Sequence, residues 1–294
     1  MTIQWFPGHM AKAIRQFQEK LKLVDIVYEL VDARIPQSSQ NPEIKNIIGE
    51  KQRLIILTKS DLADPKQTEQ WLNYFQEEGI AAVAINAQKG IGMKDVVKKS
   101  KEVLADKFEH QRSRGMKIQA IRAVTVGIPN VGKSTVINRL ARKNIAQTGN
   151  KPGVTKAQQW IKFGKELEML DTPGILWPKF EDPLVGKKLA LTGAIKDKLL
   201  NMNDIALYGI EYLCANYPGM LTKRYDLPEG MEASIEDEKG RAEVIRAIAD
   251  NRGYQDDYEL AAETLIYEIR SGMIGKFTFD RVPERVDKDK ESSI

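Results

Sequence analysis

The chain has little cysteine: Cys214 is the only one among 294 residues. An intrachain disulfide is therefore excluded, and a reducing compartment is expected. Apolar neighbours surround Cys214, which predicts a small core residue, with a reactive thiol as the alternative. The N-terminus lacks the basic and apolar segments of a secretory signal, and no uncharged apolar run approaches the roughly 18 residues of a membrane span. These absences predict a soluble cytoplasmic protein with no membrane partner.

The chain also has little excess of positive over negative charge, but the two signs are unevenly distributed along it. The formal net charge is +4, with 42% hydrophobic and 29% charged residues, which is typical of a globular protein and argues against intrinsic disorder. Residues 200–294 hold 12 Lys and Arg against 20 Asp and Glu, whereas residues 1–199 hold 33 against 21. The basic part, above all residues 94–122 and the lysines at 187, 188, 196 and 198, is expected either to face nucleic acid or to form solvated helix surfaces.

Short apolar runs indicate an α/β fold class. Three of them, at 25–31, 53–58 and 81–85, are separated by helix-like stretches, which predicts parallel strands covered on both faces. A fourth strand is expected at 120–127, and residues 158–163 and 166–170 are expected to form an antiparallel hairpin. The sequence therefore predicts a mainly parallel six-stranded sheet.

Helical patterns predominate in the last third of the chain. We expect helices at 93–108, 133–142, 183–191, 204–216, 238–251 and 257–271. The predicted organisation is an α/β domain over 1–178, a junction over 179–202, a small all-helical domain over 203–282 and a flexible tail over 283–294.

Residues 127–134 (GIPNVGKS) match the phosphate-binding loop pattern G-x-x-x-x-G-K-[ST] between a predicted strand and a predicted helix. Glycines let backbone N–H groups turn toward phosphate oxygens, and the positive end of the helix favours the anion. Lys133 is expected to neutralise the outer phosphates and Ser134 to coordinate Mg²⁺. The remaining contacts to the nucleotide are expected from Asn130, Val131, Gly132 and Thr135.

The segment Thr58-Lys59-Ser60-Asp61 follows the second predicted strand. The Asp61 carboxylate can accept hydrogen bonds from N1–H and the 2-amino group of guanine, whereas adenine has no matching pair of donors. The aliphatic stem of Lys59 can cover the base. The alternative is that Ser60 or Asp61 caps a helix.

Two further segments complete a nucleotide site. Asp171 follows the last predicted strand in D-T-P-G, so it can hold a water of the Mg²⁺ shell, while the Gly174 N–H can bind the γ-phosphate. Thr155 is expected either to complete the metal shell or to be an ordinary turn residue. Asn86-Ala87-Gln88, after the third predicted strand, can place the Ala87 N–H against guanine O6.

These segments are the GTPase motifs in a circularly permuted order, because the base-recognition segments precede the phosphate loop. Together with WFPGHM at 5–10, DAR at 32–34 and DTPGILW at 171–177, they make the sequence resemble the bacterial ribosome-biogenesis GTPase A family. The resemblance implies a GTPase that acts in late assembly of the large (50S) ribosomal subunit and is stimulated by that ribosomal particle. It also assigns RNA binding to the C-terminal helical domain, with contacts expected from basic clusters such as Lys223-Arg224 and Arg241 with Arg246. Thr58 stands where the family pattern has Asn, and Asn86-Ala87-Gln88 stands where it has Ser-Ala-Lys.

The residue after D-x-x-G is Ile175, whose side chain cannot orient water as the glutamine of many GTPases does. Hydrolysis by the chain alone is therefore expected to be slow. His9 is the candidate for orienting the attacking water, because a neutral imidazole can orient water or accept its proton. The resemblance also implies a catalytic histidine at this position. The alternative is that His9 starts a helix or contacts RNA. Asn130 matches an asparagine that helps to hold K⁺ in related GTPases.

The predicted function is thus hydrolysis of GTP to GDP and phosphate by an assembly factor with Mg²⁺ and, by resemblance, K⁺. Its predicted partners are a large-subunit precursor, rRNA and ribosomal proteins, and the chain is expected to be monomeric. The alternative is an RNA-binding assembly chaperone in which nucleotide is a structural ligand. A trafficking or signalling GTPase is disfavoured, because neither end carries a lipidation signal.

Overall fold

The computed structural model describes residues 15, 17–141, 159–171 and 182–284. Six strands form one sheet in the order β3-β2-β1-β4-β6-β5, and every neighbouring pair is parallel except β5 with β6. The strands are β1 (Ile26–Asp32), β2 (Gln52–Thr58), β3 (Ala81–Ala84), β4 (Ile121–Gly127), β5 (Gln159–Phe163) and β6 (Leu167–Asp171). The predicted mainly parallel six-stranded sheet and its hairpin are confirmed.

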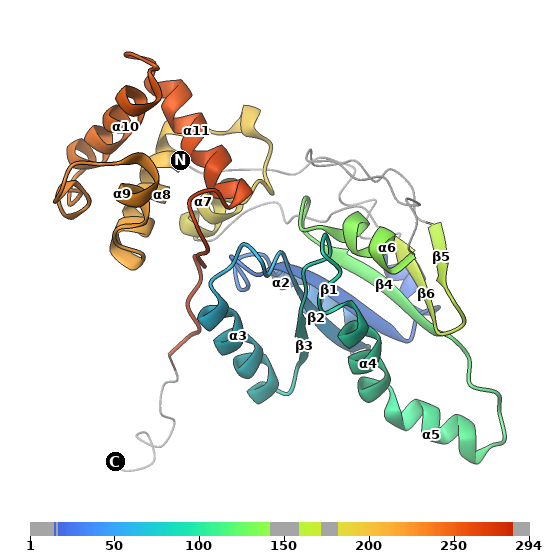
Figure 1. Cartoon of the computed structure of the whole chain (residues 1–294). Helices are drawn as coiled ribbons and strands as arrows, with labels where there is room; N and C mark the ends of the chain where they lie inside the picture. Colours follow the sequence, from blue (N-terminus) through green and yellow to red (C-terminus); the bar gives the residue numbers. More distant parts are fainter. Residues whose placement is uncertain (1–14, 16, 142–158, 172–181, 285–294) are drawn as a thin grey trace, which may run out of the picture.

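Helices cover both faces of the sheet (Figure 1). They are α2 (Pro42–Ile48), α3 (Pro65–Glu77), α4 (Met93–Val103) and α6 (Lys133–Ala141), while α5 (Ala105–Ser113) continues from α4 away from the sheet. This cover explains why all seven residues of β1 are buried. Asn41 and Asp64 cap α2 and α3, each followed by proline at the first helical position, where the missing N–H has no cost.

The single helix predicted over 93–108 is wrong, because the chain bends at Leu104 and forms α4 and α5. Leu104 leaves the helical conformation (φ −101°, ψ 18°) while its side chain stays in the core. Ser100 Oγ, one turn earlier, bonds back to the Val96 carbonyl at 2.7 Å, an interaction that often bends helices. The same hydroxyl lies 2.7 Å from Tyr28 Oη, which anchors the bend to β1.

The last third of the described chain is helical, as predicted. Its helices are α7 (Pro183–Leu191), α8 (Met202–Asn216), α9 (Met220–Tyr225), α10 (Glu238–Arg252) and α11 (Tyr258–Ser271). Cys214 lies in its core with a pKa raised to about 12 by burial and by Glu232, so the core role is confirmed. Across the described residues, no helix is long and apolar enough to cross a membrane.

The chain after α11 returns to the α/β half, as the red segment in Figure 1 shows. We call residues 275–280 the return segment. Phe277 and Phe279 are buried, and their N–H groups donate to the carbonyls of Leu62 (3.3 Å) and Arg34 (2.6 Å). The Asp280 carboxylate accepts hydrogen bonds from Ser38 N and Oγ, both at 2.7 Å, and from Lys188 Nζ at 2.8 Å. The return segment therefore fastens the helices to the carboxyl edge of the sheet.

Candidate guanine-nucleotide site

The phosphate loop connects β4 to α6 by a turn that few residues can make. Gly132 has φ +105° and Asn130 has φ +57°, both in the left-handed region where glycine and asparagine are most readily accommodated. A Cβ on Gly127 would lie 2.6 Å from the Leu30 carbonyl oxygen of β1, so the loop leaves the sheet in contact with the neighbouring strand. These glycines bring the loop backbone close to the sheet edge.

Lys133, the first residue of α6, is buried beneath this loop. Its Nζ donates to the carbonyls of Gly127 (3.0 Å) and Ile128 (2.8 Å), so the ammonium connects the end of the loop to its beginning. Ser134 and Thr135 follow in the first turn of α6 and are half-buried. The backbone N–H groups and positive dipole of a helix start favour an anion at this position.

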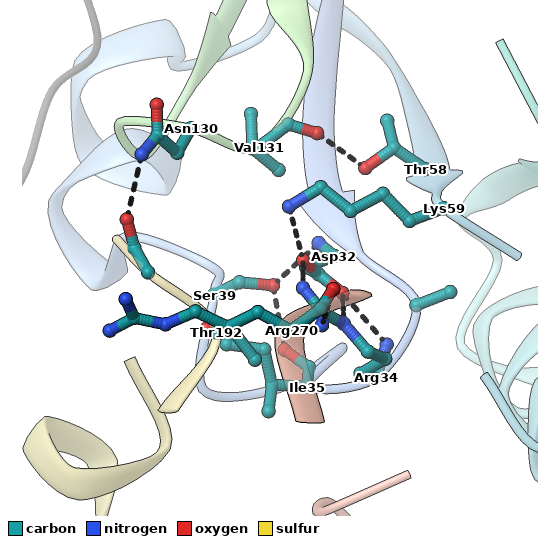
Figure 2. Close-up of polar contacts among 12 residues, drawn as sticks. Asp32, Arg34, Ile35, Ser39, Thr58, Lys59, Asn130, Val131, Thr192 and Arg270 are labelled. Atoms are coloured by element: carbon teal, nitrogen blue, oxygen red, sulfur yellow. Dashed lines mark hydrogen bonds and ion pairs between the residues drawn. The ribbon is translucent and has the colours of Figure 1, made fainter. Parts of the chain in front are cut away.

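The base-recognition segment begins where β2 ends. Thr58 is buried, and its Oγ1 lies 2.6 Å from the Val131 carbonyl of the phosphate loop and 3.1 Å from the Val31 carbonyl (Figure 2). Lys59 has φ +55°, and Ser60 N donates to the Ile85 carbonyl at 3.2 Å. Thr58 thus joins the two motifs across β1, although they are 73 residues apart in sequence.

Asp61 is half-exposed in the turn after Ser60. The alternative role of Ser60 or Asp61 as a helix cap is wrong, because Asp64 caps α3: its Oδ1 accepts hydrogen bonds from the N–H groups of Lys66 (2.9 Å) and Gln67 (3.4 Å). The carboxylate of Asp61 is therefore not committed to starting that helix.

Asn86 and Ala87 lie buried in a turn after β3, next to the base-recognition segment. Asn86 and Ile91 exchange backbone hydrogen bonds, and Asn86 Oδ1 accepts from Lys89 N at 3.0 Å. Arg139 of α6 donates to the Lys89 carbonyl at 2.8 Å. The turn is thereby tied to the helix that follows the phosphate loop.

Asp32, the last residue of β1, was not singled out for a role by sequence reasoning. It is 1% exposed and forms ion pairs with Arg34 (2.8 Å) and Lys59 (2.9 Å) (Figure 2). Burial alone would raise the pKa of the Asp32 carboxyl, but Arg34 and then Lys59 outweigh it and hold that pKa well below its usual range. A carboxylate at the very end of a fully buried strand was the signal that could have identified it.

The remaining predicted site residues are only partly described. Asp171 ends β6, which pairs with β4, so the chain leaves the sheet there beside the phosphate loop. Asn130 Nδ2 donates to the Gly193 carbonyl of the helical part at 2.8 Å. His9, Thr155 and Gly174 lie outside the described residues.

Comparison with known proteins agrees with this geometry. Residues 122–212 match the family model described as 50S ribosome-binding GTPase. Ribosome biogenesis GTPase A of Priestia megaterium is 59% identical over 95% of this chain and 97% of its own length, and that of Bacillus cereus is 53% identical over 99% and 97%. The chain belongs to the ribosome biogenesis GTPase A family. Mouse mitochondrial ribosome-associated GTPase 1 is 33% identical over 95% of this chain and 90% of its own.

Solved structures of the family share the architecture. A GDP-bound YlqF is 26% identical, with a TM-score of 0.65 over 91% of this chain and 99% of that one. GNP-bound YlqF from T. maritima gives 0.64 over 94% and 100%, also at 26% identity. The circularly permuted phosphate-loop GTPase fold with a helical C-terminal part is confirmed.

A GTPase of this family acts on GTP and typically uses Mg²⁺. The described residues fit such an ion, because Ser134 stands in the first turn of α6 and the strand ending at Asp171 adjoins β4. The Ser134 hydroxyl is an oxygen ligand of the kind that Mg²⁺ prefers.

Proposed function

We propose that guanine and phosphate are bound by the two motifs that meet at the carboxyl edge of the sheet. The observation that carries this proposal is the 2.6 Å contact between Thr58 Oγ1 and the Val131 carbonyl, since it fixes the base-recognition segment against the phosphate loop. Asp61 selects guanine, and the Lys59 stem and the Ala87 N–H complete the base contacts. Backbone N–H groups at 130–135 surround the phosphates, and Lys133 neutralises their charge.

The chemistry is in-line attack of water on the γ-phosphate. Bound Mg²⁺ would be held by Ser134 and Thr155, with Asp171 acting through a water, and would offset charge on the phosphate oxygens. Gly174 N–H binds the γ-phosphate. Because Ile175 can neither donate nor accept a hydrogen bond, we assign orientation of the water to His9.

Asn130 is the proposed ligand of K⁺. Its amide now donates to the Gly193 carbonyl, so binding of a cation by Asn130 Oδ1 leaves the Nδ2 contact to the helical part in place. K⁺ so placed would supply positive charge beside the phosphates, where other GTPases use an arginine.

The proposed partner is a precursor of the large ribosomal subunit, including its rRNA and proteins. The family description, 50S ribosome-binding GTPase, and the names of the relatives support it. We propose that the monomer docks in the GTP state and is released after hydrolysis. Its cytoplasmic location stays a prediction.

Ion pairs within the helical part indicate which basic residues are less available to contact RNA. Among the basic clusters of the helical part, Arg224, Arg241 and Arg246 pair with Glu268, Glu211 and Glu243 at 2.6–3.0 Å. These arginines would have to exchange a carboxylate for a phosphate, which reduces the net gain. The α/β half is therefore favoured as the main RNA-facing part, through exposed lysines such as Lys94 and Lys117.

Co-sedimentation with large-subunit particles, with a GTP analogue, with GDP and without nucleotide, tests the proposed partner. We expect binding to be strongest with the analogue and GTP turnover to rise when particles are added. Binding independent of nucleotide, together with unstimulated turnover, would instead favour the assembly chaperone.

The same turnover assay tests His9 and the cation. His9→Ala is expected to lower stimulated kcat about 100-fold with little change in GTP affinity, since it removes the group that orients water. An unchanged kcat would reject that role. Replacing K⁺ by Na⁺ should lower turnover if Asn130 holds the ion.

A further inference from the structure

The buried Asp32 carboxylate binds two cationic side chains, one from Arg34 shortly after β1 and one from Lys59 directly after β2. Arg34 occupies both carboxylate oxygens, Nε on Oδ1 at 2.9 Å and Nη2 on Oδ2 at 2.8 Å, and its backbone N–H also reaches Oδ1 at 3.0 Å. Lys59 Nζ donates to Oδ2 at 2.9 Å. Lys59 thus shares Oδ2 with Arg34, and the carboxylate fixes the end of the Lys59 side chain.

Lys59 needs such an anchor, because its surroundings are unfavourable to a lysine. Its backbone is left-handed, a conformation that side chains with a Cβ rarely adopt. Burial lowers the pKa of its ammonium, and the nearby Asp32 charge opposes that change. Figure 2 shows the Lys59 side chain extended, with its ammonium on Asp32.

We propose that Asp32 is a positioning residue for guanine-nucleotide binding. By holding the Lys59 ammonium, it keeps the aliphatic stem extended as a fixed surface for the base and stabilises the turn that presents Asp61. The proposal rests on the proposed function of Lys59 and Asp61 in recognising guanine. A stem fixed before the nucleotide arrives loses less conformational entropy on binding, so affinity rises.

Asp32 also serves the interface with the helical part, and this role has to be separated from the first. Arg34 Nη1 donates to the Arg270 carbonyl at 3.3 Å, and the Arg34 carbonyl accepts from Phe279 N. Loss of Asp32 alone would disturb both the Lys59 contact and this interface. A substitution of Arg34 changes the interface with the helical part but leaves the contact of Asp32 with Lys59 in place, so the two roles of Asp32 can be tested separately.

The decisive comparison is Asp32→Asn/Arg34→Gln against Arg34→Gln. The double variant removes both charges of the buried pair of Asp32 and Arg34, so that neither charge is left buried without its partner. It leaves Lys59 without its carboxylate. Arg34→Gln alone keeps the ion pair between Asp32 and Lys59 and is the matched control for the interface.

Binding of GDP and GTP by the full chain is the measurement. We expect the double variant to raise the Kd of GDP and the KM of GTP about tenfold, with kcat at saturating GTP unchanged. Arg34→Gln should stay within about twofold of the parent. Equal affinity in the double variant and in Arg34→Gln would overturn the proposal.

Two substitutions at Lys59 keep the proposal testable if the double variant does not fold. Lys59→Met keeps the apolar stem but cannot pair with Asp32, and Lys59→Arg keeps the charge. We expect Lys59→Met to lose about tenfold in GDP affinity and Lys59→Arg to retain most of it. Parental affinity in Lys59→Met would overturn the proposal.

Base preference separates this proposal from the guanine site itself. The Asp32 double variant should still prefer guanine over xanthine, because Asp61 is present, whereas Asp61→Asn should not. A changed base preference in Asp61→Asn, together with parental GDP affinity in the Asp32 double variant, overturns the positioning role alone. No change with either places the base elsewhere, and both proposals fall.

Discussion

At the scale of single residues, Thr58 shows how a departure from the family pattern is accommodated. Its hydroxyl, buried between β1 and the phosphate loop, contacts the Val131 carbonyl where the pattern has an asparagine amide. A shorter side chain thus keeps the connection between the base-recognition segment and the phosphate loop.

Thr58→Val should therefore weaken the site. We expect it to lower the free energy of unfolding by about 1–3 kcal/mol, because the Val131 carbonyl loses its donor, and to raise the Kd of GDP. Chemical denaturation and GDP titration measure the two effects. Thr68→Val is the control, since Thr68 Oγ1 bonds the Asp64 carbonyl away from the loop, and it should affect stability alone. Equal GDP affinity in both variants and the parent would contradict this account.

The sequence predicted the residues of known motifs but not the network around them. The phosphate loop and Asp61 could be found because their chemistry needs fixed residue types at fixed spacing. The partners of Asp32 could not, because the ion pair of Asp32 with Lys59 depends on which segments the fold brings together. Local periodicity contains no information about such contacts.

At the scale of elements, the strands were easier to predict than the way helices end and join. The bend at Leu104 follows a Ser100 hydroxyl that bonds back to the Val96 carbonyl, and the apolar pattern of the sequence gives no sign of this hydrogen bond. In the helical part, Glu268 of α11 holds two helices: it pairs with Arg224 of α9 and with Arg252 at the end of α10, each at 2.7 Å. That carboxylate therefore links α9, α10 and α11.

Glu268→Gln should destabilise the helical part by about 1–3 kcal/mol. Burial would raise the pKa of the Glu268 carboxyl, but Arg224, Tyr225 and Arg252 outweigh it and lower that pKa. The carboxylate therefore stabilises the fold above the ordinary glutamate pKa of about 4.3 and loses this effect as the pH falls through the lowered pKa. Thermal unfolding between pH 7 and pH 3 measures this dependence. The gap between parent and variant should narrow on acidification, and a constant gap would show that the charge is not responsible.

At the scale of the whole molecule, the return segment makes the two parts interdependent. Asp280 bonds Ser38 after β1 and Lys188 in α7, while Asn130 of the phosphate loop bonds Gly193. The nucleotide site and the helical part are therefore in direct contact through residues that are far apart in sequence. A conformational change at the phosphate loop can therefore reach the helical part directly through the contact of Asn130 with Gly193.

Asp280→Ala should loosen this attachment. Lys188 and Ser38 lose a buried carboxylate, which costs about 3 kcal/mol or more when one member of a buried pair is removed. Calorimetry should then show two separate unfolding transitions where the parent shows one, with the α/β half still stabilised by GDP. A single transition at the parental temperature would contradict the proposed attachment.

The central claim is that Asp61 meets the base of the nucleotide whose phosphates lie against Lys133. The most direct test is the relative affinity for GTP and XTP of Asp61→Asn, with Asp64→Asn as the control that preserves the cap of α3. An asparagine amide can donate to the 2-oxo group of xanthine but cannot accept the donor pair of guanine. We predict a reversal of preference from GTP to XTP for Asp61→Asn and none for Asp64→Asn. Unchanged preference for GTP in Asp61→Asn would contradict the claim.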